Sequence, residues 1–308
     1  MRPAGTEQTN PRSRGLDKKS TLAILRVLNR EDGRVASAVE KELPQIARAV
    51  NAIVQSLASG GKLYYIGAGT SGRIAILDAA ECPPTFGTRP QTVQALMAGG
   101  AKAMRGAAEG AEDSAANGAR DLAAARVAKR DVVVGLSASG TTPYVLGALK
   151  FARQRGAVTI GVTSNPHSPL ARVAKIAIVP ETGPEAITGS TRLKAGTAQK
   201  MVLNLLSTTA MVRLGRVYDN WMVYVALTNQ KLRRRAERIL EEAAGVGASI
   251  AARALRQTGH DLPVALVMLK YGTDARDAKR LLANSGGNVR LALQTPKAVR
   301  RLTKIRGK

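Results

Sequence analysis

Apolar runs and helical periodicity alternate along the middle of the chain. Five short apolar runs are continuous rather than alternating, which is typical of strands covered on both faces of a sheet. These strands are expected at residues 62–66, 92–97, 131–136, 157–162 and 175–179. Helices are expected between them, near residues 71–80, 101–117, 118–127, 142–155 and 194–214. The alternation predicts a three-layer α/β domain in which right-handed crossovers join parallel strands.

Both flanks of this domain show helical periodicity alone. Apolar residues recur at helical spacing from Leu22 to Leu43, and Pro44 suits the first turn of a helix that continues to residue 58. Later helices are expected at residues 233–244, 246–256, 274–283 and 288–293, while the run 264–269 fits a strand or a helix. The pattern divides the chain into an N-terminal arm with helices (1–49), an α/β domain (50–215) and a C-terminal helical region (216–308).

Two strand-to-helix loops of the α/β domain are rich in glycine and hydroxyl side chains. They lie at residues 67–73 and 137–142, at the carboxyl ends of expected strands, where sheets of this kind bind ligands. Backbone N–H groups at a helix N-terminus attract anions, most often phosphates. One hydroxyl suffices to cap a helix, and the second loop has four. The loops therefore predict a phosphate site built from their hydroxyl side chains, among them Thr70 and Ser71 of the first loop.

The first loop also spells a nominal dinucleotide motif, G-x-G-x-x-G, at Gly67, Gly69 and Gly72. That motif requires an acidic residue about 20 positions later to hold a ribose. Residues 86–92 contain no carboxylate, and the chain has no G-x-x-x-x-G-K-[ST] loop. We therefore expect neither a dinucleotide nor any other cofactor.

Two acidic positions are candidates for proton transfer. Glu81 follows an apolar helix and precedes Cys82-Pro-Pro84. A negative charge at a helix C-terminus opposes the helix dipole, which stabilises the neutral carboxyl and suits it to acid–base catalysis. A surface glutamate in a turn fits the spacing equally well. Residues 109–113 hold a second acidic cluster, for which a solvated helix face is the simpler interpretation. Cys82 has no nearby histidine and the two histidines lack metal-ligand spacing, so we expect a structural cysteine and no metal.

Composition limits the class of protein. The 308 residues carry one cysteine, no apolar run approaching a membrane span and no secretory signal, which predicts a soluble cytoplasmic protein. The net charge of +25 suggests either a nucleic-acid partner or a cationic surface. Aromatic residues make up only 3% and no nucleic-acid motif occurs, which favours a surface that attracts anionic substrates over a specific nucleic-acid site.

Several segments together resemble the N-acetylmuramic acid 6-phosphate etherases, a family of the sugar-isomerase (SIS) superfamily related to the glucokinase regulatory proteins. They are residues 6–10, 20–26, 40–46, 66–73, 80–87, 109–113 and 183–200, of which the last is the longest. The resemblance implies a flavodoxin-like SIS domain with N-terminal helices and a small C-terminal helical domain, whose last part resembles a ubiquitin-associated unit. It also implies a homodimer that acts on a phosphorylated amino sugar in cell-wall recycling.

The resemblance further implies an activity and a set of site residues. Such an enzyme cleaves the D-lactyl ether of N-acetylmuramic acid 6-phosphate with water, giving N-acetylglucosamine 6-phosphate and D-lactate. Glu112 would take the C2 proton of the opened sugar, Glu81 would protonate the departing lactyl oxygen, and water would then add at C3. The phosphate-binding hydroxyls of the superfamily fall on Ser71, Ser137, Ser139 and Thr142, and Thr70 precedes the first of them. Residues Glu185, Ser190 and Lys194 would line the sugar site.

Two other functions use the same loops. A non-catalytic phosphosugar-binding regulator would need no paired carboxylates, and the known regulators have two SIS domains where this chain has room for one. An aldose–ketose isomerase would share the C2 base but would not need the segment Glu81-Cys-Pro-Pro84. The sequence departs from the expected family pattern at Trp221 and Tyr224 and in its high basicity, away from both glutamates.

Overall fold

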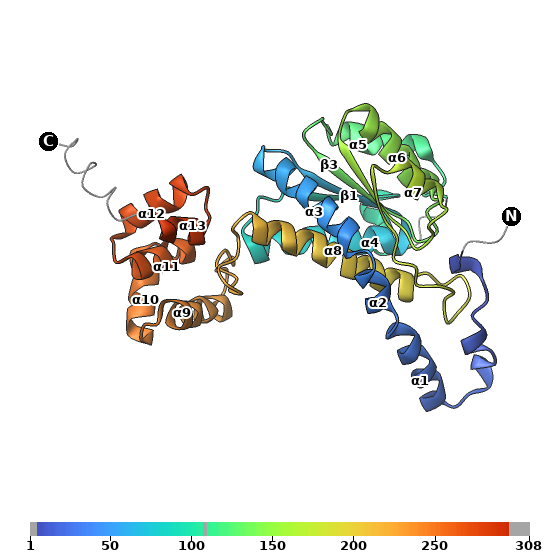
Figure 1. Cartoon of the computed structure of the whole chain (residues 1–308), viewed down its shortest axis with the longest axis horizontal. Helices are drawn as coiled ribbons and strands as arrows, with labels where there is room; N and C mark the ends of the chain where they lie inside the picture. The colour runs from blue at the N-terminus through green and yellow to red at the C-terminus, as the bar shows by residue number, and fades with distance from the viewer. Residues whose placement is uncertain (1–4, 107–109, 296–308) are drawn as a thin grey trace. The chain divides into compact units, whose positions relative to one another are not determined.

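The computed structural model describes residues 5–106 and 110–295 (Figure 1). Its sheet has five parallel strands in the order β2-β1-β3-β4-β5. The strands are β1 (Leu63–Gly67), β2 (Val93–Met97), β3 (Val132–Leu136), β4 (Val158–Val162) and β5 (Ile176–Ile178). All five expected strands and the parallel sheet are confirmed. In this register Gly67 lies opposite both Met97 and Leu136, so the loops that follow β1 and β3 emerge side by side.

Helices cover both faces of the sheet, which confirms the three-layer fold (Figure 1). The helices α5 (Ala115–Ala124), α6 (Pro143–Gln154) and α7 (Pro169–Val173) lie on one face, and α3 (Leu43–Ala58), α4 (Gly69–Phe86) and α8 (Lys194–Arg213) lie on the other. Side chains alternate along a strand, so Tyr64 packs with the α5–α6 side while Tyr65 lies beside Asp78 of α4. The strands read as unbroken apolar runs because both faces are buried.

Helices α5 and α6 pack unusually closely through two glycines. A Cβ atom at Gly118 would collide with the carbonyl oxygen of Tyr144, and one at Gly147 would collide with the backbone of Ala115. This approach brings the start of α6 against the turn that precedes α5. The N–H of Tyr144 donates to the carbonyl oxygen of Glu112 at 3.0 Å, so the helix pair fixes the backbone of a predicted catalytic residue.

Two expectations about the helices are wrong. The helix expected over 101–117 is instead a 3₁₀ turn, η4 (Gly100–Met104), followed by irregular chain, and α5 begins only after Ser114, whose hydroxyl accepts from the N–H of Asn117. Gly106 and Gly110 lie in this stretch, and Gly110 has a φ of +68°, which interrupts a helix. Residues 107–109, and with them Glu109, fall outside the described part.

The second error concerns the end of α4. The helix does not stop near Glu81 but continues through Pro83 and Pro84 to Phe86. It ends at Gly87, which has a φ of +61° and donates its N–H to the carbonyl of Pro83 at 3.0 Å. Glu81 is therefore not at a helix C-terminus, and the dipole argument for its chemistry does not apply.

The N-terminal helices follow the expected pattern. They are α1 (Thr21–Asp32) and α2 (Val35–Glu40), and Pro44 lies in the first turn of α3. Three short 3₁₀ turns precede them: η1 (Gly5–Glu7), η2 (Pro11–Ser13) and η3 (Leu16–Lys18).

The chain forms two compact units. One comprises Met1–Cys82 with Thr88–Ala210, and the other comprises Pro83–Gly87 with Met211–Lys308. The second unit contains α9 (Gln230–Ala244), α10 (Ala248–Gln257), α11 (Leu262–Tyr271), α12 (Ala275–Asn284) and α13 (Val289–Gln294). The ambiguous run 264–269 is thus helical. Among the described residues, no helix is both long and apolar enough to cross a membrane.

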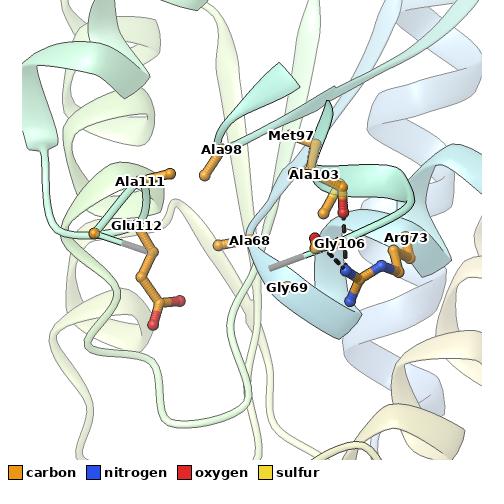
Figure 2. Close-up of a pocket in the computed structure, with 10 residues that line it drawn as sticks. Ala68, Gly69, Arg73, Met97, Ala98, Ala103, Gly106, Ala111 and Glu112 are labelled. Carbon is orange, nitrogen blue, oxygen red and sulfur yellow. Dashed lines mark hydrogen bonds between the residues drawn. The ribbon is translucent and has the colours of Figure 1, made fainter. Parts of the chain in front are cut away.

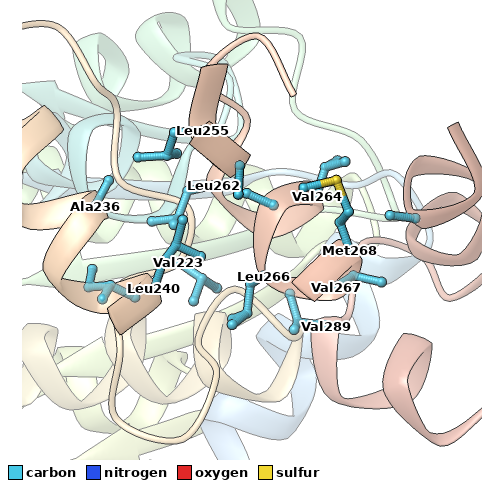
Figure 3. Close-up of a cluster of buried hydrophobic side chains, with 14 of the residues drawn as sticks. Val223, Ala236, Leu240, Leu255, Leu262, Val264, Leu266, Val267, Met268 and Val289 are labelled. Atoms are coloured by element: carbon cyan, nitrogen blue, oxygen red, sulfur yellow. The ribbon is translucent and has the colours of Figure 1, made fainter. Parts of the chain in front are cut away.

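The second unit has its own apolar core. Figure 3 shows α11 at its centre, where Leu262, Leu266 and Val267 pack against α9 and α13. The two departures from the family pattern lie here. Trp221 packs against this core, and the hydroxyl of Tyr224 donates to the carbonyl oxygen of Gly287. They contribute to the C-terminal unit.

Candidate functional site

The hydroxyl-rich loops after β1 and β3 enclose a cavity of about 330 Å³, here called the hydroxyl cavity. Its walls include every hydroxyl residue predicted to hold a phosphate: Thr70, Ser71, Ser137, Ser139 and Thr142. The register of the sheet explains this meeting, since β1 and β3 are neighbours that end at the same level. Thr141 and Thr191 add two further hydroxyls to the walls.

The second loop holds its hydroxyls in a hydrogen-bonded chain. The Oγ atom of Ser137 lies 2.8 Å from Oγ1 of Thr142, and Oγ of Ser139 lies 2.8 Å from Oγ1 of Thr141. The N–H of Gly140 donates to Oγ of Ser137 at 3.0 Å. Gly140 has a φ of +72°, and a side chain there would collide with Ser168. This geometry preorganises the hydroxyls around a small volume.

The capping explanation for these hydroxyls does not hold at α6. Thr142 occupies the position before the helix, yet its side chain makes no capping hydrogen bond. Its hydroxyl pairs with Ser137 instead. Pro143 has no N–H and the N–H of Tyr144 is donated to Glu112, so the loop hydroxyls, rather than the first N–H groups of α6, are the donors that the cavity offers to an anion.

Glu112 lies on the wall between the hydroxyl cavity and a second cavity of about 290 Å³. The second cavity is lined mainly by small residues, including Ala68, Ala98, Ala103 and Ala111, with Met97. Figure 2 shows Glu112 across this cavity from Arg73. Residues 110–113 form a turn, so the expectation of a solvated helix face is wrong, and the Glu112 side chain is exposed at the cavity.

Arg73 secures the loop that borders the second cavity. Its Nη2 atom donates to the carbonyls of Ala103 at 2.8 Å and Gly106 at 3.0 Å, as the dashed lines in Figure 2 mark. Its Nε donates to the carbonyl of Met104 at 3.4 Å. Arg73 thus attaches the chain after β2 to α4. Its place inside the first glycine loop is the sequence signal that could have predicted this role.

Glu81 does not join Glu112 in either cavity. It is exposed on α4, more than three helical turns or roughly 18 Å beyond Gly69, which lies at the cavity. One turn earlier on the same side of α4, Leu77 is 48% exposed. Within one chain, the described structure therefore does not bring the two predicted catalytic glutamates together.

Glu185 and Lys194, which the resemblance assigns to the sugar site, are both fully buried. The Glu185 carboxylate accepts from the N–H groups of Lys194 at 3.0 Å and Ala195 at 2.9 Å, and so caps the start of α8. Burial raises the pKa of Glu185, although these N–H groups oppose that shift. The Lys194 ammonium donates to Glu31 and to the carbonyl of Pro184. Ser190 is half-buried and lies beside Thr191 of the cavity wall.

Two acidic residues of the hydroxyl cavity were missed. Glu7 reaches it from the N-terminal η1 turn, and Asp113 follows Glu112. Residues 6–10 belong to the family-like segments, but nothing in their local pattern predicts that they lie near the hydroxyl loops.

Cys82 behaves as a structural residue. It is buried, and its Sγ lies 3.4 Å from the carbonyl oxygen of Asp78. Burial raises the pKa of its thiol to about 12, so it is not a thiolate nucleophile near neutral pH. Across residues 5–106 and 110–295, no three His, Cys, Asp or Glu side chains are grouped so that they could hold a metal ion.

The chain is similar to known proteins of one family. Residues 45–153 match the glucokinase regulatory protein N-terminal SIS domain, and residues 110–209 match the SIS domain. The N-acetylmuramic acid 6-phosphate etherase of Serratia proteamaculans (strain 568) is 53% identical over 288 residues, which cover 94% of this chain and 97% of that protein. The etherase of Yersinia pestis (strain Pestoides F) is 52% identical, with 94% and 98% covered.

A solved structure is similar to this chain at lower sequence identity. It is a putative phosphosugar isomerase involved in capsule formation from Bacteroides fragilis, 22% identical, with a TM-score of 0.49 over 71% of this chain and 100% of that one. The near full-length identity to the two etherases is the stronger relationship, and by it the chain belongs to the N-acetylmuramic acid 6-phosphate etherase family.

Proposed function

We propose that this protein cleaves the D-lactyl ether of N-acetylmuramic acid 6-phosphate with water, releasing N-acetylglucosamine 6-phosphate and D-lactate. The observation that carries the proposal is the 53% identity to a named etherase over 94% of the chain. The hydroxyl cavity supports it independently, because the cavity suits a phosphate monoester and has a carboxylate, Glu112, on its wall. The enzyme is a carbon–oxygen lyase.

Phosphate binding at the two loops would orient the sugar. The chain of hydroxyls from Ser137 to Thr142, with Thr70 and Ser71 of the first loop, supplies donors for three phosphate oxygens. The phosphate is attached at C6, remote from the ether at C3. The binding energy of the phosphate can therefore be used to position the reacting carbons beside Glu112, although the phosphate takes no part in the bond that breaks.

Glu112 would act as the base that removes the C2 proton. An alkoxide is a poor leaving group, but opening the sugar ring exposes an aldehyde at C1 that acidifies C2. Loss of the C2 proton then expels the lactyl oxygen from C3 as it is protonated, and water adds to the unsaturated aldehyde at C3. The carbonyl of Glu112 is held by Tyr144, so its side chain starts from a fixed backbone.

Glu81 would be the acid that protonates the lactyl oxygen, and it would come from a second copy of this chain. Its exposure on α4, outside both cavities, supports this arrangement over a site complete in one chain. The neighbouring exposed Leu77 supports burial of this face in a homodimer. We place the enzyme in the cytoplasm, with residues 50–215 as its phosphosugar-binding domain.

A regulator that binds sugar phosphates without turnover is the second candidate. The match of residues 45–153 to the glucokinase regulatory protein SIS domain favours it, as does the separation of the two glutamates in one chain. Such a protein would bind the substrate and leave it intact. An isomerase of the same superfamily would instead convert a sugar phosphate between aldose and ketose forms.

One assay separates the lyase from the other two functions. The purified protein is incubated with N-acetylmuramic acid 6-phosphate in deuterated water, and D-lactate is measured enzymatically. The lyase releases lactate and leaves deuterium at C2 of N-acetylglucosamine 6-phosphate. Binding without lactate would favour the regulator, and a product free of label would contradict elimination and readdition.

A further inference from the structure

Glu7 reaches the hydroxyl cavity from a part of the chain that shares no element with the loops. It belongs to the N-terminal arm, here residues 5–20, and is exposed at the cavity with Thr191 and Ser139. Its carboxylate lies against the loop that leads into α8. A Cβ atom built on Gly189, which has a φ of +76°, would lie 3.4 Å from Oε2 of Glu7.

A buried cluster around Glu31 anchors the arm a few residues after Glu7. Oε2 of Glu31 accepts from Nδ2 of Asn10 at 2.8 Å and from Nζ of Lys194 at 2.6 Å. Its Oε1 accepts from Nε of Arg12 at 2.5 Å. Nδ2 of Asn10 and Nζ of Lys194 also donate to the carbonyl of Pro184, at 3.1 and 2.7 Å. The cluster therefore joins the arm, α1 and the start of α8.

This cluster is built to stay charged and closed. Glu31 is 2% exposed and Lys194 is 1% exposed, so neither can exchange its partner for water. The Arg12 hydrogen bond, helped by Lys194 and Asn10, lowers the pKa of Glu31 to about 2. Removing one member would leave another buried and unpaired. In the arm, Thr6 and Asn10 are buried, while Glu7 between them lines the cavity.

We propose that Glu7 is a sugar-binding residue, which accepts hydrogen bonds from hydroxyl or amide N–H groups at the end of the ligand remote from its phosphate, and that the Glu31 cluster exists to hold it there. The ligand class rests on the proposed function. A carboxylate repels phosphate, so Glu7 favours the one orientation in which the phosphate meets the hydroxyl loops. At the end remote from its phosphate, N-acetylglucosamine 6-phosphate carries neutral hydroxyl and amide donors, from which a carboxylate accepts well.

The test is calorimetric binding by the full chain, with N-acetylglucosamine 6-phosphate and inorganic phosphate as the two probes. Glu7→Ala should weaken binding of the sugar phosphate at least about tenfold, as expected for loss of a hydrogen bond to a charged group. It should leave the affinity for inorganic phosphate within about twofold of the wild-type value. Glu7→Gln keeps an acceptor and should fall between. Glu40→Gln changes an exposed glutamate of α2 and is the matched control. Unchanged sugar affinity in Glu7→Ala, or equal weakening of both probes, would overturn the proposal.

A double-mutant cycle tests whether the cluster acts through Glu7. Asn10→Ala alone should weaken binding of the sugar phosphate, and combining it with Glu7→Ala should cause no further loss of affinity. Arg12→Ala, at a side chain 45% exposed, is the milder second variant if Asn10→Ala lowers the melting temperature sharply. Additive losses in both cycles would show that the cluster does not serve Glu7.

These binding measurements do not depend on turnover. If the wild-type protein binds the sugar phosphate and releases no lactate, the proposed function fails while the role of Glu7 is still decided. If lactate is released and Glu7→Ala binds normally, the role of Glu7 fails alone. A wild-type protein that binds phosphate but not N-acetylglucosamine 6-phosphate would contradict the role of Glu7 as well.

Discussion

The carbonyl oxygen of Glu112 accepts a hydrogen bond from the N–H of Tyr144 at 3.0 Å. Tyr144 is in the first turn of α6, the helix that begins at the hydroxyl loop. The proposed base and the proposed phosphate site are thus attached to the same helix end. The relationship depends on the glycine contact between α5 and α6, which makes that contact a target for mutation.

Gly118→Ala should disturb both stability and turnover. Its Cβ would meet the Tyr144 carbonyl, which is backbone and cannot rotate away, so α5 and α6 must separate. Overpacking of this kind costs about 1–3 kcal/mol. Urea unfolding and kcat measure the two effects. Gly33→Ala is the matched control, because its φ is −56° and a Cβ there would meet its nearest atom only at 3.5 Å, an ordinary contact. Wild-type kcat and stability in Gly118→Ala would contradict the tight contact.

Ser137→Ala should raise KM far more than it lowers kcat. Ser137 is 3% exposed and hydrogen bonds Thr142 and Gly140, so its loss removes a phosphate ligand and frees two partners. Loss of a hydrogen bond to a charged ligand predicts an increase of roughly 10- to 100-fold. Ser249→Ala, on an exposed position of α10, should change neither constant. An equal KM in Ser137→Ala and wild type would remove Ser137 from the phosphate site.

Glu112→Gln and Glu81→Gln should each abolish lactate release while substrate still binds, and mixing them should restore activity. If each site uses Glu112 of one copy and Glu81 of the other, a mixed dimer has one intact site and one doubly mutated site. Random exchange of equal amounts then gives about a quarter of wild-type activity, because half of the dimers are mixed. The measurement is lactate release after co-refolding or subunit exchange.

No recovery on mixing, with mixed dimers verified by differently tagged copies, would contradict the shared site. Retained turnover in either single variant would contradict the assignment of that glutamate.

Glu31→Gln should destabilise the protein by about 3 kcal/mol at pH 7. The pKa of folded Glu31 is about 2 against an ordinary value of 4.5, and each unit of depression corresponds to about 1.4 kcal/mol. Because the folded value is the lower one, this stabilisation is present above about pH 4.5 and is lost as the pH falls towards 2. The difference in unfolding free energy between wild type and Glu31→Gln should therefore shrink between pH 5 and pH 2.

Urea titrations at several pH values measure that difference, with Glu40→Gln as the control on an exposed position. A difference independent of pH over this range would show that Glu31 is not a depressed carboxylate.

Local pattern was sufficient for the sheet and for the meeting of the two hydroxyl loops at one cavity. Continuous apolar runs marked all five strands, since a strand buried on both faces needs no information from elsewhere. The two hydroxyl loops followed from the rule that parallel strands present their carboxyl ends at one edge. Where local pattern failed, a terminator was misjudged: the helix over 101–117 does not form around Gly106 and Gly110, and α4 continues past Glu81 through two prolines.

The sequence by itself determined the parallel α/β sheet, the helical flanks and the meeting of the two hydroxyl loops, because each depends on periodicity or on glycine and hydroxyl residues within a few positions. Only the tertiary structure decided which acidic residues reach the cavity. It buried Glu185 and Lys194, left Glu81 outside and brought Glu7 in. Those outcomes depend on contacts such as Lys194 with Glu31, 163 positions apart, and no local pattern encodes which distant residues will share a buried charge.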